Sequence, residues 1–130
     1  MKQIINHPCT VRWGDLDAFG HVNNTLFLRY VEEARVQWFL SLDRTWSEPE
    51  SAPILAAIQM NFRKPIRWPE TVRVELYVER IGTKSLSLAH KLFSTTKSDL
   101  LYADGNAVMV WVDRSANTVP LPDAVRSACS

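Results

Sequence analysis

The chain has few glycines, few cysteines, almost no net charge and no long apolar run, and each shortage excludes a class of function. Four glycines leave little material for a phosphate-cradling loop, and no Gly-x-Ser-x-Gly motif is present. Cys9 and Cys129 match no metal-ligand spacing, so we expect no metal site and two reduced thiols, one in a strand and one in a tail. A formal net charge of +1 gives no bulk attraction to nucleic acid or to an anionic membrane.

The apolar segments are too short to span a membrane, and the N-terminus lacks the apolar core of a signal peptide. We therefore expect a cytoplasmic protein with no membrane span. A chain of 130 residues, 46% hydrophobic and 22% charged, has the composition of an ordinary globular protein and can bury a real core. This predicts a single domain over residues 1–130.

The spacing of apolar residues predicts one strand, one long helix and about four further strands. Residues 25–42 contain no Gly or Pro and favour a helix, with Asn24 as its N-cap. Alternation with a period of two predicts the strands, at about residues 6–13, 54–62, 72–79, 86–92 and 102–113. Residues 43–53 form a predicted loop, and the tail after Asp113 shows no period. The order predicts an α+β fold in which a curved antiparallel sheet of about five strands wraps round one long central helix.

Polar side chains that could serve chemistry gather between the first strand and the helix. Asp15 and Asp17 precede a helix start, where unpaired N–H groups could stabilise an oxyanion while a carboxylate attacks or activates water. An Asp near a helix start also simply stabilises the helix, and residue types alone favour that structural interpretation. A calcium loop is excluded, because Phe19 and Leu26 stand where oxygen ligands are needed.

The same stretch carries a dense match to a known family. The matching residues are WGDLDAFGHVNN at positions 13–24, then Tyr30, Glu33-Ala34-Arg35 and Trp38-Phe39. They resemble the signature of 4-hydroxybenzoyl-CoA-thioesterase-type hotdog proteins, and Gly-His-Val-Asn-Asn is similar to one acyl-CoA thioesterase branch. The resemblance implies the hotdog fold over nearly the whole chain and hydrolysis of a CoA thioester to free acid and CoA, without a cofactor.

The resemblance also assigns catalytic roles within the loop. Asp17 matches the catalytic carboxylate, which acts as a nucleophile or as a general base on water. The backbone N–H of Asn24 would polarise the thioester oxygen. His21 is a secondary candidate, whose expected role is to hold the loop by hydrogen bonds. Asp15 is expected to be structural, either capping loop N–H groups or pairing with Arg12.

Candidate substrate-binding residues come from the later strands and turns. By resemblance, Lys84 lies in the turn that contacts the phosphates of CoA. Arg63 belongs to a small basic cluster with the same potential, although plain solvated surface charge explains either residue equally well. Gln59 and Asn61 share one face of a strand and could line the pocket from an opposite subunit. His7 and His90 have no constellation around them in the sequence and are taken as structural.

Apolar residues off the main helix stripe, together with the edges of a sheet, predict assembly. Leu28, Val36, Phe39 and Leu40 fall off the stripe and are more than a soluble monomer should expose. With the resemblance, they predict a homodimer, possibly a dimer of dimers, whose active sites are shared between subunits. Two alternatives remain at this stage: a non-catalytic binding protein for acyl-CoA or an acyl carrier, and a hotdog hydratase or dehydratase.

Overall fold

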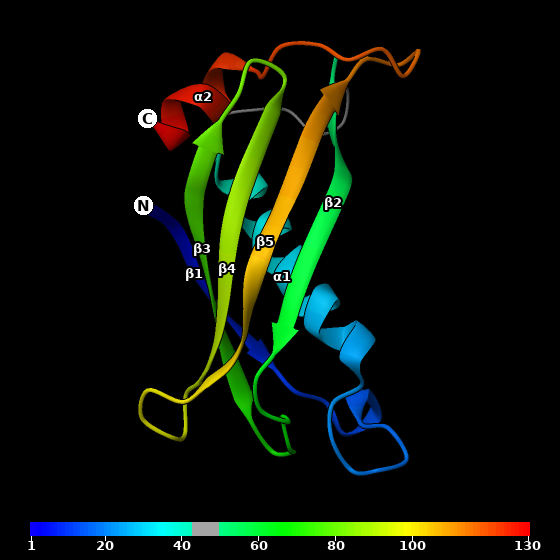
Figure 1. Ribbon diagram of the computed structural model, residues 1–130, viewed down its shortest axis with the longest axis vertical. Coiled ribbons are helices and arrows are strands. Elements are labelled where there is room, and N and C mark those ends of the chain that lie inside the picture. Colours follow the sequence, from blue (N-terminus) through cyan, green and yellow to red (C-terminus); the bar gives the residue numbers. More distant parts are fainter. Residues whose placement is uncertain (43–49) are drawn as a thin grey trace.

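A five-stranded antiparallel sheet forms the centre of the protein in the computed structural model, which describes residues 1–42 and 50–130 (Figure 1). The strands lie in the order β1-β3-β4-β5-β2. Their bounds are β1 Lys2–Thr10, β2 Ala52–Phe62, β3 Thr71–Ile81, β4 Ser85–Ser94 and β5 Leu101–Val112. The predicted α+β class and antiparallel sheet are confirmed.

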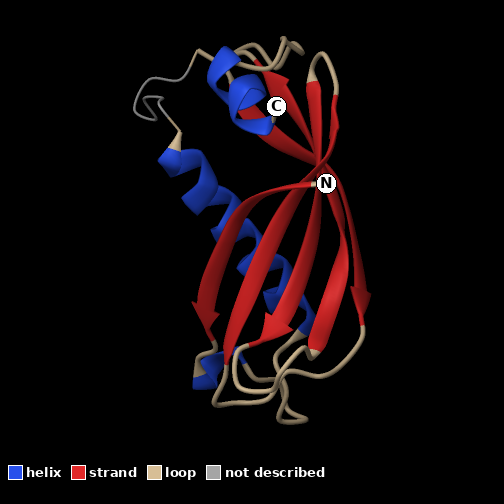
Figure 2. Ribbon diagram, turned by 90° about the vertical axis from the view of Figure 1, so that its left-hand side faces the viewer, coloured by secondary structure: helices blue, strands red, loops and turns tan. Residues whose placement is uncertain are grey.

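The long helix α1 spans Asn24–Ser41 and lies against one face of the curved sheet (Figure 2). The side chain of Asn23, not Asn24, caps it by accepting the Thr25 N–H at 3.0 Å. The predicted cap is therefore one residue too late, because two adjacent asparagines could each serve. The predicted apolar stripe of the helix is buried, and it consists of Phe27, Tyr30, Val31, Ala34 and Trp38. Phe39 was placed off that stripe, yet it is also buried and packs edge-on against Trp111, with ring centroids 6.1 Å apart.

The core lies between α1 and the alternating inward side chains of the sheet. Every second residue of β3 is buried from Val72 to Val78, as the period of two predicts. β5 lies inside the sheet between β4 and β2, which accounts for its apolar residues on both faces. Gly105 of β5 is required by a close approach, since an added Cβ would lie 2.0 Å from the carbonyl oxygen of Gln59.

Three element boundaries differ from the sequence prediction. β1 begins at Lys2 and ends at Thr10, because it pairs with β3 over that whole length, and residues 13–15 form a 3₁₀ helix instead. The tail forms a second helix, α2 at Asp123–Cys129, so the prediction of a single helix is wrong. Of the predicted loop 43–53, residues 43–49 lie outside the described residues and Ala52 already belongs to β2.

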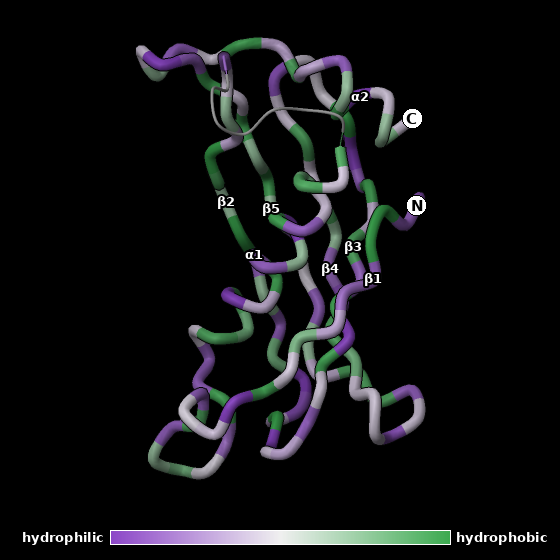
Figure 3. Tube along the Cα trace, turned by 180° about the vertical axis from the view of Figure 1, so that it is seen from behind, coloured by the Kyte–Doolittle hydropathy of each residue, from purple (hydrophilic) through white to green (hydrophobic). Residues whose placement is uncertain are grey.

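The two edges of the sheet differ in character. β1 carries Lys2 and Pro8, which protect an edge from pairing. β2 is largely hydrophobic (Figure 3), and Ile54 and Leu55 are 50% and 43% exposed. No helix within residues 1–42 and 50–130 is long and apolar enough to cross a membrane.

Candidate active site

A short hairpin just before α1 holds Asp17. Leu16 and Val22 form an isolated antiparallel bridge, and the Asp17 N–H donates to the His21 carbonyl at 2.8 Å. The Gly20 N–H closes the turn onto the Asp17 carbonyl at 3.2 Å, with Gly20 at φ +83°, a conformation that favours glycine. These backbone bonds fix Asp17 within the hairpin that leads into the Asn23 cap.

The Asp17 carboxylate is only lightly used by the fold. Its Oδ1 accepts the Phe19 N–H at 2.8 Å and lies 4.0 Å from Nδ1 of His21. Among the described residues, Oδ2 has no hydrogen-bond partner, and the side chain is 30% exposed. A carboxylate that is positioned by one backbone bond, open to solvent and left with a spare oxygen can act as a base or a nucleophile.

Asp15, in contrast, links two other parts of the fold through one oxygen. Its Oδ2 accepts the Arg12 N–H at 3.0 Å and the Tyr30 hydroxyl at 2.7 Å, which ties the loop to the middle of α1. Burial, reinforced by the Asp15 carboxylate, raises the pKa of Tyr30 above its ordinary value, so the phenol stays protonated. Of the two structural roles predicted for Asp15, the structure shows the capping of a loop N–H.

A cavity of about 260 Å³ opens at the start of α1. It is lined by residues of the loop, the helix and the segment after β2: His21, Val22, Asn24, Phe27, Phe62, Arg63, Lys64 and Pro65. The Val22 N–H donates to the Ile66 carbonyl at 2.8 Å and holds the two segments together. Asn24 supplies the first N–H of α1, which helix geometry leaves without an intrahelical acceptor. The cavity therefore joins a helix N-terminus to basic and aromatic side chains.

The predicted binding residues Gln59, Asn61 and Arg63 form one polar network on β2 and just beyond it. Gln59 donates to Asn61 at 2.7 Å, and Asn61 donates to Asp104 of β5 at 3.0 Å. The Arg63 guanidinium binds the same carboxylate, with Nη2 3.0 Å from Oδ1. Burial would raise the pKa of Asp104, but the bonds from Asn61 and Arg63 outweigh it and the pKa lies below its ordinary value. The structure thus brings these three residues together.

Lys84 lies apart from them. It sits in the turn between β3 and β4, at the opposite end of the sheet from the Asp17 hairpin (Figure 1). Eleven residues of β3 span roughly 35 Å at about 3.3 Å each, so Lys84 and Asp17 of one chain are far apart. The Lys84 ammonium contacts the Thr118 hydroxyl at 3.4 Å.

Two buried polar residues, one on β4 and one on α1, lie near each other, and the sequence did not predict this. His90 of β4 and Arg35 of α1 are both buried, and the charge of Arg35 acts on His90. Nε2 of His90 lies 3.1 Å from the Gln59 carbonyl, whereas Nδ1 of His90 and Nη1 of Arg35 have no partner within the described part of the chain. Burial lowers the pKa of His90 to about 4. The alternation of β4, which turns position 90 inward, is the only sequence signal that could have indicated the burial of His90.

Comparison with known proteins identifies the family. A Pseudomonas aeruginosa protein provisionally named a thioesterase is 38% identical, with a TM-score of 0.94 over 99% of this chain and 100% of its own. A provisionally named acyl-CoA thioesterase from Xanthomonas campestris is 40% identical, with a TM-score of 0.82 over 89% and 98%. A chloroplast acyl-acyl carrier protein thioesterase of Arabidopsis thaliana is 26% identical over 90% of this chain and 63% of its own length. A family model described as the Thioesterase-like superfamily matches residues 11–129, which confirms the resemblance: the chain belongs to that superfamily.

Proposed function

We propose that the protein is an acyl-CoA thioesterase that hydrolyses a CoA thioester to the free acid and CoA. The observation that carries this proposal is the Asp17 carboxylate, held by one backbone bond in the hairpin whose residues His21 and Val22 line the helix-start cavity. The superfamily supports the reaction class, and the 40% identical Xanthomonas protein supports the CoA thioester as substrate.

In this mechanism Asp17 acts in one of two ways. As a general base it takes a proton from water, whose oxygen attacks the thioester carbon. As a nucleophile it attacks the carbon itself and forms an anhydride, which water then opens. In both, the carbonyl oxygen gains negative charge opposite the Asn24 N–H, and the sulfur leaves as CoA thiolate and takes up a proton. His21 contributes its backbone carbonyl, which orients the Asp17 hairpin.

The site is completed by a second copy of the chain. β2 ends the sheet with an exposed apolar edge, beside a groove of about 510 Å³ whose walls include Val36, Leu40 and Leu55. Joining two copies along β2 would cover this surface. Because Lys84 is far from Asp17 in its own chain, it can serve the phosphates of CoA only at the other copy's site. A homodimer, or a dimer of dimers, therefore accounts for the exposed β2 edge and allows Lys84 its proposed role.

The chain forms one hotdog domain over residues 1–130, in which the sheet wraps α1, and it works in the cytoplasm. Hydrolysis by Asp17 and water needs no metal or redox cofactor. The acyl group and its carrier are left open, because the Arabidopsis relative is named for acyl carrier protein thioesters.

Release of free thiol tests the reaction directly. Purified protein is assayed with a thiol reagent against acyl-CoAs of differing chain length, branching and aromaticity, and in parallel against acyl carrier protein thioesters. We expect turnover of at least one CoA thioester, with release of one thiol per molecule of acid. Binding of acyl-CoA without thiol release would support the non-catalytic alternative, and hydrolysis of only carrier-protein thioesters would move the proposal to that substrate.

Light scattering after gel filtration tests the assembly. We expect a dimer or a tetramer of the 14.9 kDa chain. Leu55→Lys places a charge on the exposed β2 edge and should dissociate the assembly and abolish activity together. Gln3→Lys on the β1 edge is the matched control and should change neither. A fully active monomer at micromolar concentration would contradict the shared site.

A further inference from the structure

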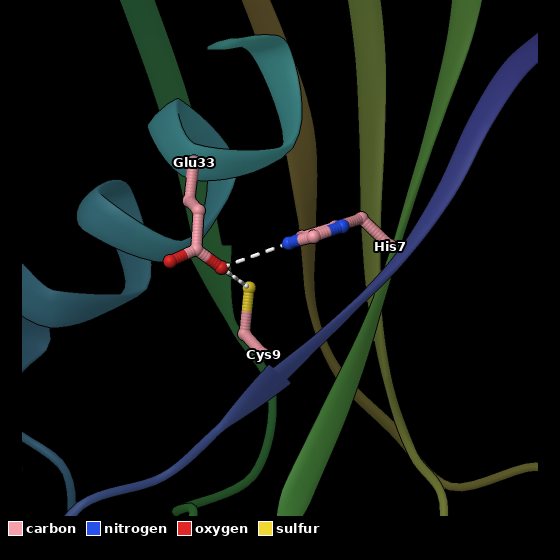
Figure 4. A group of neighbouring side chains, drawn as sticks. All are labelled: His7, Cys9 and Glu33. Carbon is pink, nitrogen blue, oxygen red and sulfur yellow. Dashed lines mark hydrogen bonds and ion pairs between the residues drawn. The ribbon is translucent and has the colours of Figure 1, made fainter. Parts of the chain in front are cut away.

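Three potential metal ligands from two distant parts of the sequence converge on one point beside α1 (Figure 4). His7 and Cys9 are two residues apart on β1, so their side chains lie on the same face of the strand. Both reach Oε2 of Glu33 on α1: the Cys9 thiol donates to it at 3.0 Å, and Nε2 of His7 lies 2.9 Å from it. The three ligand atoms all lie within 4.8 Å of one another.

The chemistry of this set fits zinc. Imidazole nitrogen, thiolate sulfur and carboxylate oxygen are the usual ligands of Zn²⁺ in proteins. A tetrahedral ion with ordinary bond lengths holds such atoms about 3.3–3.6 Å apart, so the two hydrogen-bonded contacts need to lengthen by only about half an ångström. A thiolate and a carboxylate also balance the double charge of the ion. Arg12, whose charge acts on Glu33, and Arg29, which lines the neighbouring cavity, oppose a cation.

Space for a further ligand lies next to the cluster. Cys9 and Glu33 line a cavity of about 640 Å³ together with Arg12, Asp15, Arg29 and Tyr30. Three protein ligands with room for a water or a small anion match the open type of zinc site. Because His7 and Cys9 belong to β1 and Glu33 to α1, a bound ion would also clamp the helix to the edge of the sheet.

We propose that His7, Cys9 and Glu33 form a zinc site with an open fourth position beside this cavity. The site is separate from hydrolysis at Asp17, which requires no metal, and neither proposal depends on the other. Zinc replaces the proton that Cys9 gives to Glu33, so binding releases a proton. The cluster is not a cysteine nucleophile, because its thiol is buried and donates to a carboxylate, which favours the neutral form.

Metal titration of the untagged, metal-free chain tests the site. Zn²⁺ is titrated in competition with a chromophoric chelator, and Co²⁺ serves as a spectroscopic probe. We expect one equivalent of zinc per chain, a higher melting temperature with zinc, and a thiolate-to-cobalt charge-transfer band. Absence of stoichiometric binding, or a cobalt spectrum without that band, would overturn the proposal without any variant.

Variants assign the ligands. Cys9→Ser should abolish the charge-transfer band and lower zinc affinity by at least about 100-fold, the upper range for loss of a mere supporting contact. His7→Gln and Glu33→Gln should lower the affinity as well. Cys129→Ser, the matched control, removes the other buried thiol and should leave both zinc affinity and spectrum unchanged. An unchanged spectrum in Cys9→Ser, or loss of binding in Cys129→Ser, would place the metal elsewhere and overturn the assignment.

Discussion

Asp15 and Asp17 are separated by one residue, yet the fold uses them in opposite ways. Asp15 accepts two hydrogen bonds through one oxygen, from Arg12 N–H and from the Tyr30 hydroxyl, and so links the loop to α1. Asp17 accepts a single hydrogen bond, from the Phe19 N–H two residues away, and its side chain is 30% exposed. A carboxylate that cross-links separate segments contributes stability, whereas a carboxylate held by a single local bond is available for chemistry.

Glu70 is a stronger example of a carboxylate that cross-links the fold. Its two oxygens accept bonds from the Thr71 N–H and from the hydroxyls of Ser94, Thr96 and Tyr102. Burial would raise the pKa of Glu70, but these bonds outweigh burial and hold the pKa below its ordinary value. The carboxylate thus ties the start of β3 to β4 and β5, and it has no capacity left for a substrate.

Glu70→Ala should have the largest effect on stability. It leaves the buried Tyr102 and Ser94 hydroxyls without their acceptor, and the free energy of unfolding should fall by about 2–4 kcal/mol. The turnover of the folded enzyme should not change. Denaturant unfolding and thiol release measure the two effects, with Glu70→Gln as the variant of equal size. A loss of rate in folded Glu70→Ala would break the distinction between the two kinds of carboxylate.

The burial of His90 predicts that the free energy of unfolding depends on pH. His90 is buried with a pKa of about 4, below its unfolded value of 6.5, so the unfolded chain binds the extra proton first. The stability that neutral His90 contributes is therefore complete above pH 6.5 and is lost as the pH falls toward 4, by on the order of 3 kcal/mol. Unfolding of wild type and His90→Gln across this range measures it. Equal slopes for both proteins would refute the assignment.

Tyr30→Phe should have a smaller effect on stability and tests the structural role of Asp15. It removes one hydroxyl from the Asp15 carboxylate without creating a cavity, so we expect a loss of about 1–2 kcal/mol in the free energy of unfolding. Turnover should remain close to wild type, because Asp17 keeps its own bond to Phe19. Thermal unfolding and steady-state kinetics provide the check. A large loss of turnover with normal stability would instead give Asp15 or Tyr30 a part in the reaction.

Local patterns in the sequence were enough to predict most of the framework. The apolar stripe of the helix and the alternating strands depend on neighbouring residues, and each was predicted to within a few positions. The short helix α2 was missed because Pro120 and Pro122 hide its periodicity, although a proline just before Asp123 is itself a helix-start signal. Arg29 lies about one helical turn from both Glu32 and Glu33, and it pairs with Glu32.

Contacts between distant segments could not be predicted in this way. Glu33 is bound by His7 and Cys9 of β1, and nothing in the local sequence shows that β1 passes beside that turn of α1. The hydrogen bonds that Glu70 accepts and the burial of His90 near Arg35 also depend on strand register. In the loop, the family resemblance assigned catalysis to Asp17 and a structural role to Asp15, but nothing in the sequence showed that the Tyr30 hydroxyl reaches Asp15.

The most direct test measures Asp17→Asn and Asp15→Asn side by side, each for kcat on the best thioester and for melting temperature. We expect Asp17→Asn to lower kcat by at least ~10²-fold, the scale of a lost general base, with an unchanged melting temperature. Asp15→Asn should lower the melting temperature, with a smaller loss of rate. Near-normal turnover in Asp17→Asn, or a large loss of rate in a normally stable Asp15→Asn, would contradict the assignment of the chemistry to Asp17.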